Sequence, residues 1–207
     1  MSGAASKAAT GSGLAKIPVG LWVILASCVS TALICASAFS VAKLDNSLFW
    51  LGRNEEGEGV VFRANVYTPV AVSTRAIEYA IAQWPTLDNA IAFSYLQEGH
   101  GFYILTSPAD GDWLGETWAY DVTTQLWHKR AYLDADTGNL LCSRATCHVM
   151  FNGAHLIGDN GVGRTNSGLL MQLDLDDYAD GDNAQKWLRR WRALAAGQNN
   201  LKRTFQH

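Results

Sequence analysis

The clearest signal of fold class in this chain is the stretch Thr117-Trp118-Ala119-Tyr120-Asp121-Val122-Thr123-Thr124-Gln125-Leu126-Trp127-His128-Lys129-Arg130. Aromatic and β-branched residues flank a polar centre, which is the pattern of two β-strands joined by a turn. Asp121 and Thr124 suit the turn because their short polar side chains bond to nearby backbone groups. The stretch therefore predicts an antiparallel hairpin that carries aromatic residues on its faces.

Three other segments repeat this plan of two short apolar runs around a polar or Gly-rich turn. Their strand pairs are 48–52 with 60–64, 90–95 with 102–105, and 148–151 with 155–158. The last turn is Asn152-Gly153, and Asn-Gly between apolar runs is the strongest short hairpin signal. The body of the chain therefore predicts consecutive antiparallel hairpins.

Residues 74–82 differ from the hairpins and predict a short helix. Ser73-Thr74 offers an N-cap, and Ile77, Ala80 and Ile81 fall on one helical face. Pro85 follows and stops the helix.

The regular spacing of the hairpins predicts an all-β chain of β-propeller-like blades. The pattern of Trp118, Tyr120, Asp121, Thr124, Trp127 and Arg130 resembles the blade repeat of kelch-like propellers, in which aromatic residues fill the space between blades. A β-sandwich is the alternative. A four-stranded blade uses about 40–50 residues, so the body supplies roughly three to four blades and the predicted ring is incomplete.

The N-terminal part does not match this body. We expect a disordered polar N-terminus over 1–16, an apolar segment over 17–42, and the propeller-like domain over 43–207. No charged residue lies between Ile17 and Ala42, which predicts an apolar helix long enough to span a bilayer. Leu25-Ala26-Ser27-Cys28 looks like a lipoprotein box with Cys28 as the lipidated residue, and Ala36-Ser37-Ala38 resembles a secretory cleavage site. A fused unrelated sequence, or a start assigned too far upstream, is the other interpretation.

Neither composition nor motifs predict an enzyme, a metal site or a cofactor. The chain has 16 basic and 19 acidic residues, so it lacks the excess of positive charge that proteins wrapping nucleic acid carry. Cys142 and Cys147 have no second Cys/His pair at zinc spacing, and the acid-rich run 174–182 lacks the glutamate of an EF-hand. No nucleophile elbow accompanies the histidines, which we interpret as turn or edge residues. A carbohydrate-handling enzyme on a propeller is the weakest alternative.

One basic and aromatic cluster near the C-terminus predicts an interface, because Arg and Trp are enriched in interface cores. Its members are Lys186, Trp187, Arg189, Arg190, Trp191 and Arg192. Ordinary packing of the tryptophans beside solvated charges is the alternative.

A further pattern extends over most of the chain in colinear order, and its segments are 44–53, 59–65, 73–78, 97–103, 118–128, 147–153 and 186–194. Together these segments resemble the packaged DNA stabilisation family of short-tailed phages, and the similarity covers roughly residues 39–205. Val66 stands where the family pattern leads us to expect a glycine, and Arg75 replaces an expected histidine.

This resemblance implies a propeller-type tail accessory subunit without catalytic residues or cofactors, present here as a truncated or fused copy. It implies a virion tail location, with the portal and tail-adaptor ring, the tail needle protein and copies of itself as partners, and indirect contact with packaged DNA. The alternative is a membrane-anchored or lipoprotein-type β-rich binding domain, membrane-associated or secreted through residues 17–42.

Overall fold

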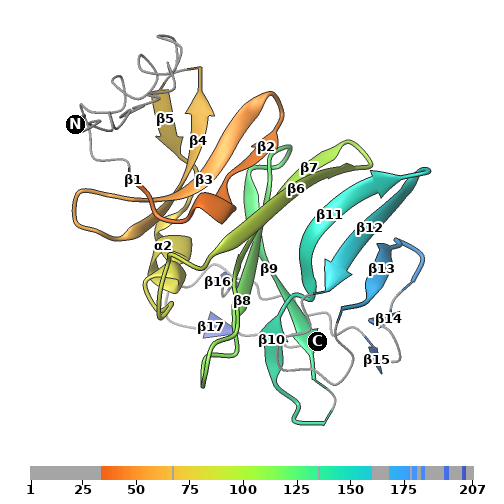
Figure 1. Cartoon of the computed structure of the whole chain (residues 1–207). Helices are drawn as coiled ribbons and strands as arrows, with labels where there is room; N and C mark the ends of the chain where they lie inside the picture. The colour runs from red at the N-terminus through yellow and green to blue at the C-terminus, as the bar shows by residue number, and fades with distance from the viewer. Residues whose placement is uncertain are drawn as a thin grey trace, which may run out of the picture.

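The computed structural model describes residues 34–66, 68–134, 136–159, 168–177, 179–180, 183–184, 194–195 and 202–203. Three antiparallel sheets lie side by side in the order in which they occur along the chain (Figure 1). The predicted all-β, propeller-like class is therefore confirmed, and the described residues form an incomplete propeller, an open arc of consecutive sheets.

The first sheet contains β1 (Ile34–Cys35), β2 (Ala42–Leu44), β3 (Ser47–Arg53), β4 (Gly59–Asn65) and β5 (Thr68–Ala71). The second contains β6 (Ile91–Gln97), β7 (His100–Ser107), β8 (Glu116–Asp121), β9 (Leu126–Leu133) and β10 (Leu140–Cys142). The third contains β11 (Ala145–Phe151), β12 (Ala154–Asp159) and β13 (Leu170–Leu173). Two short ladders follow, β14 (Ala179–Asp180) with β15 (Asn183–Ala184) and β16 (Leu194–Ala195) with β17 (Lys202–Arg203).

The predicted hairpins are confirmed as the pairs β3–β4, β6–β7, β8–β9 and β11–β12. At the β11–β12 turn, Asn152 and Gly153 both have positive φ, 49° and 80°. Two positive φ angles suit the right-handed twist of the flanking strands, and Asn-Gly accepts them at low cost. The register of the third sheet is thus set by its turn.

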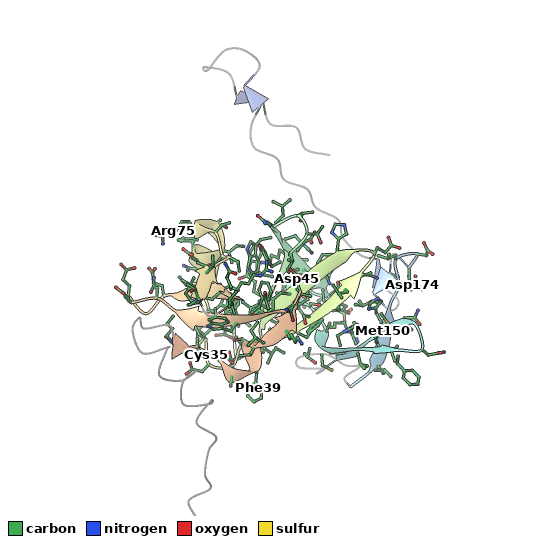
Figure 2. The ribbon with its side chains drawn as sticks, turned by 90° about the horizontal axis from the view of Figure 1, so that it is seen from above. Cys35, Phe39, Asp45, Arg75, Met150 and Asp174 are labelled. Carbon is green, nitrogen blue, oxygen red and sulfur yellow. The ribbon has the colours of Figure 1, made fainter. Side chains whose placement is uncertain are left out.

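Strand β6 lies against both β2 and β11, so one edge strand of each sheet gathers at the same place. From this inner strand each sheet runs outward through strands that are consecutive in sequence. Successive blades of a β-propeller have this arrangement. Viewed from above, the first sheet (Cys35) and the third sheet (Met150) lie at opposite ends of the molecule (Figure 2).

The main core lies between the first and second sheets, and we call this contact the first joint. Phe49 is fully buried there, and its ring centroid lies 5.5 Å from that of Tyr103 and 6.1 Å from that of Tyr120. Tyr120 in turn packs at 5.0 Å against Trp127, whose indole N–H donates to the Val72 carbonyl at 2.9 Å. The aromatic residues of the 117–130 hairpin therefore fill the space between two sheets, as predicted.

The predicted helix near 74–82 is confirmed as α2 (Arg75–Ile81), with Ile77 and Ile81 buried against the core. Thr74 has the extended backbone of an N-cap but makes no side-chain capping bond. Ser73 instead joins the helix to the sheet: its hydroxyl accepts the Val61 N–H at 3.2 Å and donates to the Glu78 carboxylate at 3.0 Å.

The end of the predicted apolar helix has a different structure. Residues 34–42 contain β1, a 3-10 turn (η2, Ala38–Ser40) and the first residue of β2, while residues 17–33 lie outside the described part. In the ranges that the structure describes, no helix is long and apolar enough to cross a membrane. Among the side chains described in this segment, Ser37 and Ser40 are the buried ones, whereas Phe39 and Val41 are exposed.

Two serines explain why this segment folds onto the sheets. Ser37 and Ser40 are almost fully buried. The Ser37 hydroxyl donates to the Ala90 carbonyl at 2.7 Å, and the Ser40 hydroxyl accepts the Leu51 N–H at 3.0 Å. Tyr103 donates to the Ser40 carbonyl at 2.8 Å, and burial raises the pKa of Tyr103, which keeps its donor proton. Ser37 of the predicted cleavage site Ala36-Ser37-Ala38 is thus buried, and its hydrogen bond to Ala90 links the first sheet to the start of the second.

Val66, which departs from the family pattern, has a backbone φ of 57°. This left-handed region costs a residue with a Cβ roughly 1–2 kcal/mol, whereas glycine adopts it freely. We expect Val66→Gly to raise the free energy of unfolding by about 1 kcal/mol in urea titrations. Val70→Gly, on strand β5 with φ outside that region, is the matched control and is expected to destabilise by about as much. A lower free energy of unfolding in Val66→Gly than in the wild type would contradict the assignment of backbone strain to Val66.

Candidate functional site

The second sheet presents two chemically different faces. The face toward the first sheet carries the apolar and aromatic core described above. Among the described residues, the face toward the third sheet buries a smaller cluster of Tyr95, Ile104 and Ala119, against which Phe93, Phe102 and Leu173 pack. We call this contact between the second and third sheets the second joint. The four histidines of the described residues, His100, His128, His148 and His155, all contact each other or the aromatic rings at this second joint.

His148 of β11 and His155 of β12 form a direct pair, with Nε2 of the first 2.9 Å from Nδ1 of the second. The His148 ring stacks on Phe93 at a centroid distance of 6.3 Å and lies 5.2 Å from Tyr95, both on β6. His155 meets Tyr95 edge-on at 5.7 Å. Burial, and secondarily the neighbouring His155, lower the pKa of His148, so this imidazole is neutral near pH 7.

Arg130 of β9 covers the same rings from the second sheet. Its guanidinium lies 5.5 Å from the Tyr95 centroid and 5.2 Å from that of Phe102. Its Nε–H donates to Nε2 of His128 at 3.3 Å. Burial of the ring and then the Arg130 charge lower the pKa of His128 to about 4, with Asp121 acting in the opposite direction. His128 is therefore a neutral acceptor at pH 7, although the residue as a whole is exposed and its ring nitrogen is shielded mainly by Arg130.

The histidines and aromatic rings at the second joint form a row that we call the histidine strip: His100, Phe102, His128, Tyr95, His148 and His155. Asp121 lies at the end of this strip, beside His100. Its carboxylate lies 2.8 Å from Nδ1 of His100, and it accepts the Thr124 hydroxyl at 2.7 Å and the Thr123 N–H at 2.9 Å. Burial raises the pKa of Asp121, but the bonds from Thr124, His100 and the Thr123 backbone outweigh it and bring the pKa below its ordinary value. The turn role predicted for Asp121 and Thr124 is confirmed, and Asp121 also binds a histidine.

A buried ion pair between Arg144 and Asp159 also lies at the second joint. Arg144 donates from Nε and Nη2 to one carboxylate oxygen of Asp159, at 3.0 and 2.9 Å, and the two side chains are 8% and 0% exposed. The Arg144 guanidinium lies 5.2 Å from the ring centroid of Tyr132 on β9. The second and third sheets are thus joined by charged and aromatic groups rather than by a large apolar core.

The opposite face of the third sheet is open and apolar. Alternation along β11 places Val149 and Phe151 on the side away from the histidine pair, and they are 54% and 67% exposed. Leu170 at the start of β13 is 70% exposed. Exposed apolar side chains that gather on one sheet face are typical of an interaction surface.

Most of the predicted site residues lie outside the described ranges. These are Cys28 and the basic and aromatic cluster of Lys186, Trp187, Arg189, Arg190, Trp191 and Arg192. In the acid-rich run, Asp174 accepts the Asp176 N–H at 2.9 Å and Asp177 accepts the Ala179 N–H at 3.0 Å, so both carboxylates shape turns. The described residues contain no group of three or more His, Cys, Asp or Glu side chains placed to hold a metal ion.

The clustering of the histidines and the Arg144–Asp159 pair were not predicted from the sequence. The sequence pattern indicated separate turn or edge histidines, whereas the structure brings them to one contact between sheets. One signal was present in the sequence: His100 and Phe102, and likewise His128 and Arg130, are two residues apart and so share a strand face. No comparable pattern of residue spacing indicates that the third sheet packs against the second.

Comparison with protein families gives one match for this chain. Residues 27–172 match the family described as "Bacteriophage P22 Gp10, beta-propeller". The match spans all three sheets and begins earlier than the predicted similarity, inside the apolar run. No curated protein is similar enough to be matched.

Proposed function

This chain belongs to the phage stabilisation family of structural, virion-associated β-propeller proteins, and on that premise we propose that it helps to close the portal in the phage tail and so retains packaged DNA. The family match supports this role because it covers most of the chain, including every strand from β1 to β12. The membrane-anchored alternative has no comparable support.

The observation that carries the proposal is the open, apolar face of the third sheet. A structural subunit acts by shape and by the surfaces that it buries in an assembly. Val149, Phe151 and Leu170 form such a surface at the end of the arc, where a further β-sheet or a neighbouring subunit would pack. The portal and tail-adaptor ring, the tail needle protein and further copies of the chain are the proposed partners.

The charge of the chain favours indirect rather than direct contact with DNA. Its formal net charge is −3. The arginines at the second joint are engaged within the fold, Arg130 with His128 and two aromatic rings and Arg144 with Asp159. Retention of DNA would therefore follow from plugging the exit channel, not from binding along phosphates.

Co-sedimentation of the full chain with purified portal and adaptor rings tests this function. We expect the wild type to sediment with the rings, and Phe151→Asp to lose at least roughly tenfold in affinity, because the charge would be buried in the interface. Tyr79→Asp on α2 is the matched control, since Tyr79 is also exposed (72%) but lies on the first-sheet side. Clean separation of the wild-type chain from the rings would exclude the proposed role.

A further inference from the structure

We propose that the joint between the second and third sheets is acid-sensitive: the third sheet detaches as the histidines at this joint take up protons, while the first and second sheets stay together. The inference goes beyond the tail role and does not depend on it. It stands on the geometry of the histidine strip and on the contrast between the two joints.

The joint contains imidazoles at positions where an added proton has an unfavourable environment. His148 lies between Phe93, Tyr95 and a second imidazole, with 2.9 Å between the two ring nitrogens of the pair. Because one nitrogen of the pair must donate to the other, full protonation of both rings replaces the hydrogen bond with two opposed cations. His128 accepts a hydrogen bond from Arg130, and protonation of its Nε2 would remove that acceptor and bring two cations together.

Nearby carboxylates offset these charges only in part: Asp121 favours the charged form of His128, but burial and Arg130 outweigh it. Asp121 already binds His100, Thr123 and Thr124, and Asp159 already binds Arg144. Glu116, the remaining acid on strands β6–β9 and β11–β13, bonds to Trp84 and Lys129 on the opposite face of the second sheet. Among the described residues, the following titratable or charged groups have contacts that place them at the joint: Tyr95 from β6, His100 from β7, Asp121 from β8, His128, Arg130 and Tyr132 from β9, Arg144, His148 from β11, and His155 and Asp159 from β12.

The direction of the pH effect follows from proton linkage. In the closed joint the pKa values of His148 and His128 lie below the ordinary value of 6.5, and that of His128 is about 4. The open state therefore binds more protons than the closed state below about pH 6.5, so acid favours opening. The stabilisation is complete above the ordinary pKa and is lost as the pH falls toward the lowered one. Asp121, with its pKa below the usual value, stays ionised over this range.

The two joints differ in what holds them together. The first joint buries Phe49, Leu51, Tyr103 and Leu105 completely, and it is closed by the Ser37 and Ser40 bonds, which do not titrate in this range. At the second joint the buried apolar cluster is smaller and consists of Tyr95, Ile104 and Ala119, with Ile157 buried on the face of the third sheet that carries His148. Acid is thus expected to separate the third sheet from the second and to leave the contact between the first and second sheets intact.

Hydrogen exchange of the full chain at pH 7.5, 6.0 and 5.0, corrected for intrinsic exchange rates, tests this directly. Peptides from β11 and β12 are expected to open roughly tenfold more at pH 5.0 than at pH 7.5, while peptides from β3 and β4 keep their protection. The first-sheet peptides are the internal control for global unfolding. No pH dependence in β11 and β12, or equal loss of protection in all three sheets, would overturn the proposal.

A variant identifies the titrating group. His148→Phe keeps an aromatic ring against Phe93 and Tyr95 but cannot take up a proton, so the pH-dependent opening should shrink severalfold. His100→Gln is the matched control, because His100 bonds to Asp121 and lies outside the imidazole pair, and it should keep the wild-type pH dependence. If His148→Phe and wild type responded to pH identically, the assignment to the imidazole pair would be wrong. If His148→Phe does not fold, the wild-type exchange data still decide whether the joint is acid-sensitive.

Discussion

Replacing Arg144 with methionine is expected to lower the free energy of opening the third sheet by about 3–5 kcal/mol, because the fully buried carboxylate of Asp159 would lose the guanidinium that bonds it. The same change removes the guanidinium that covers the Tyr132 ring of the second sheet. Native-state hydrogen exchange of β11 and β12 measures this opening. We expect these strands to lose nearly all protection in the variant while β3 and β4 are unchanged.

The double variant Arg144→Met/Asp159→Leu separates loss of the ion pair from loss of packing. Replacing both members of a buried ion pair by apolar groups is often close to neutral, so the double variant should recover most of the protection. If the single and double variants opened equally, the buried charge would not be the cause.

Phe49→Ala is expected to destabilise the chain by about 3–5 kcal/mol, the usual cost of truncating a buried phenylalanine. Phe49 is 0% exposed and packs on Tyr103 and Tyr120 of the second sheet, while the Arg63 guanidinium lies 5.6 Å from its ring centroid. The truncation would open a cavity at the first joint. Urea titration followed by tryptophan fluorescence measures the loss of stability.

Phe39→Ala is the matched control for this change. Phe39 lies in η2, close in sequence to the first sheet, but its side chain is 74% exposed. Truncating it should change the free energy of unfolding by less than about 0.5 kcal/mol. Similar losses in the two variants would contradict the assignment of the main core to the first joint.

The hairpins and the short helix were predictable because their signals are local. Asn152-Gly153 specifies its turn, Asp121 and Thr124 specify theirs, and Ile77 and Ile81 mark the buried face of α2. Residues 34–42 could not be assigned in this way. An uncharged apolar run is compatible with a membrane helix and with a buried strand, and the choice depends on partners such as Leu51 and Ala90 that are distant in sequence.

The candidate site was less predictable than the fold. His148 and Tyr95 meet because β11 lies against β6, and that contact depends on how two sheets stack. Arg144 and Asp159 are separated by a complete hairpin, so no local pattern links them. The exposure of Phe151 likewise depends on which face of the third sheet is covered.

The order of the strands also bears on how the chain is made. Within each of the three sheets, the strands form one continuous stretch of sequence, from residue 34 to 71, from 91 to 142 and from 145 to 173. Pairing therefore requires only short loops to close, which favours rapid folding for an all-β protein. A chain emerging from the ribosome can complete the first sheet before the second has been synthesised, and then add each later sheet to an existing surface. Synthesis from the N-terminus thus follows the direction in which the arc grows.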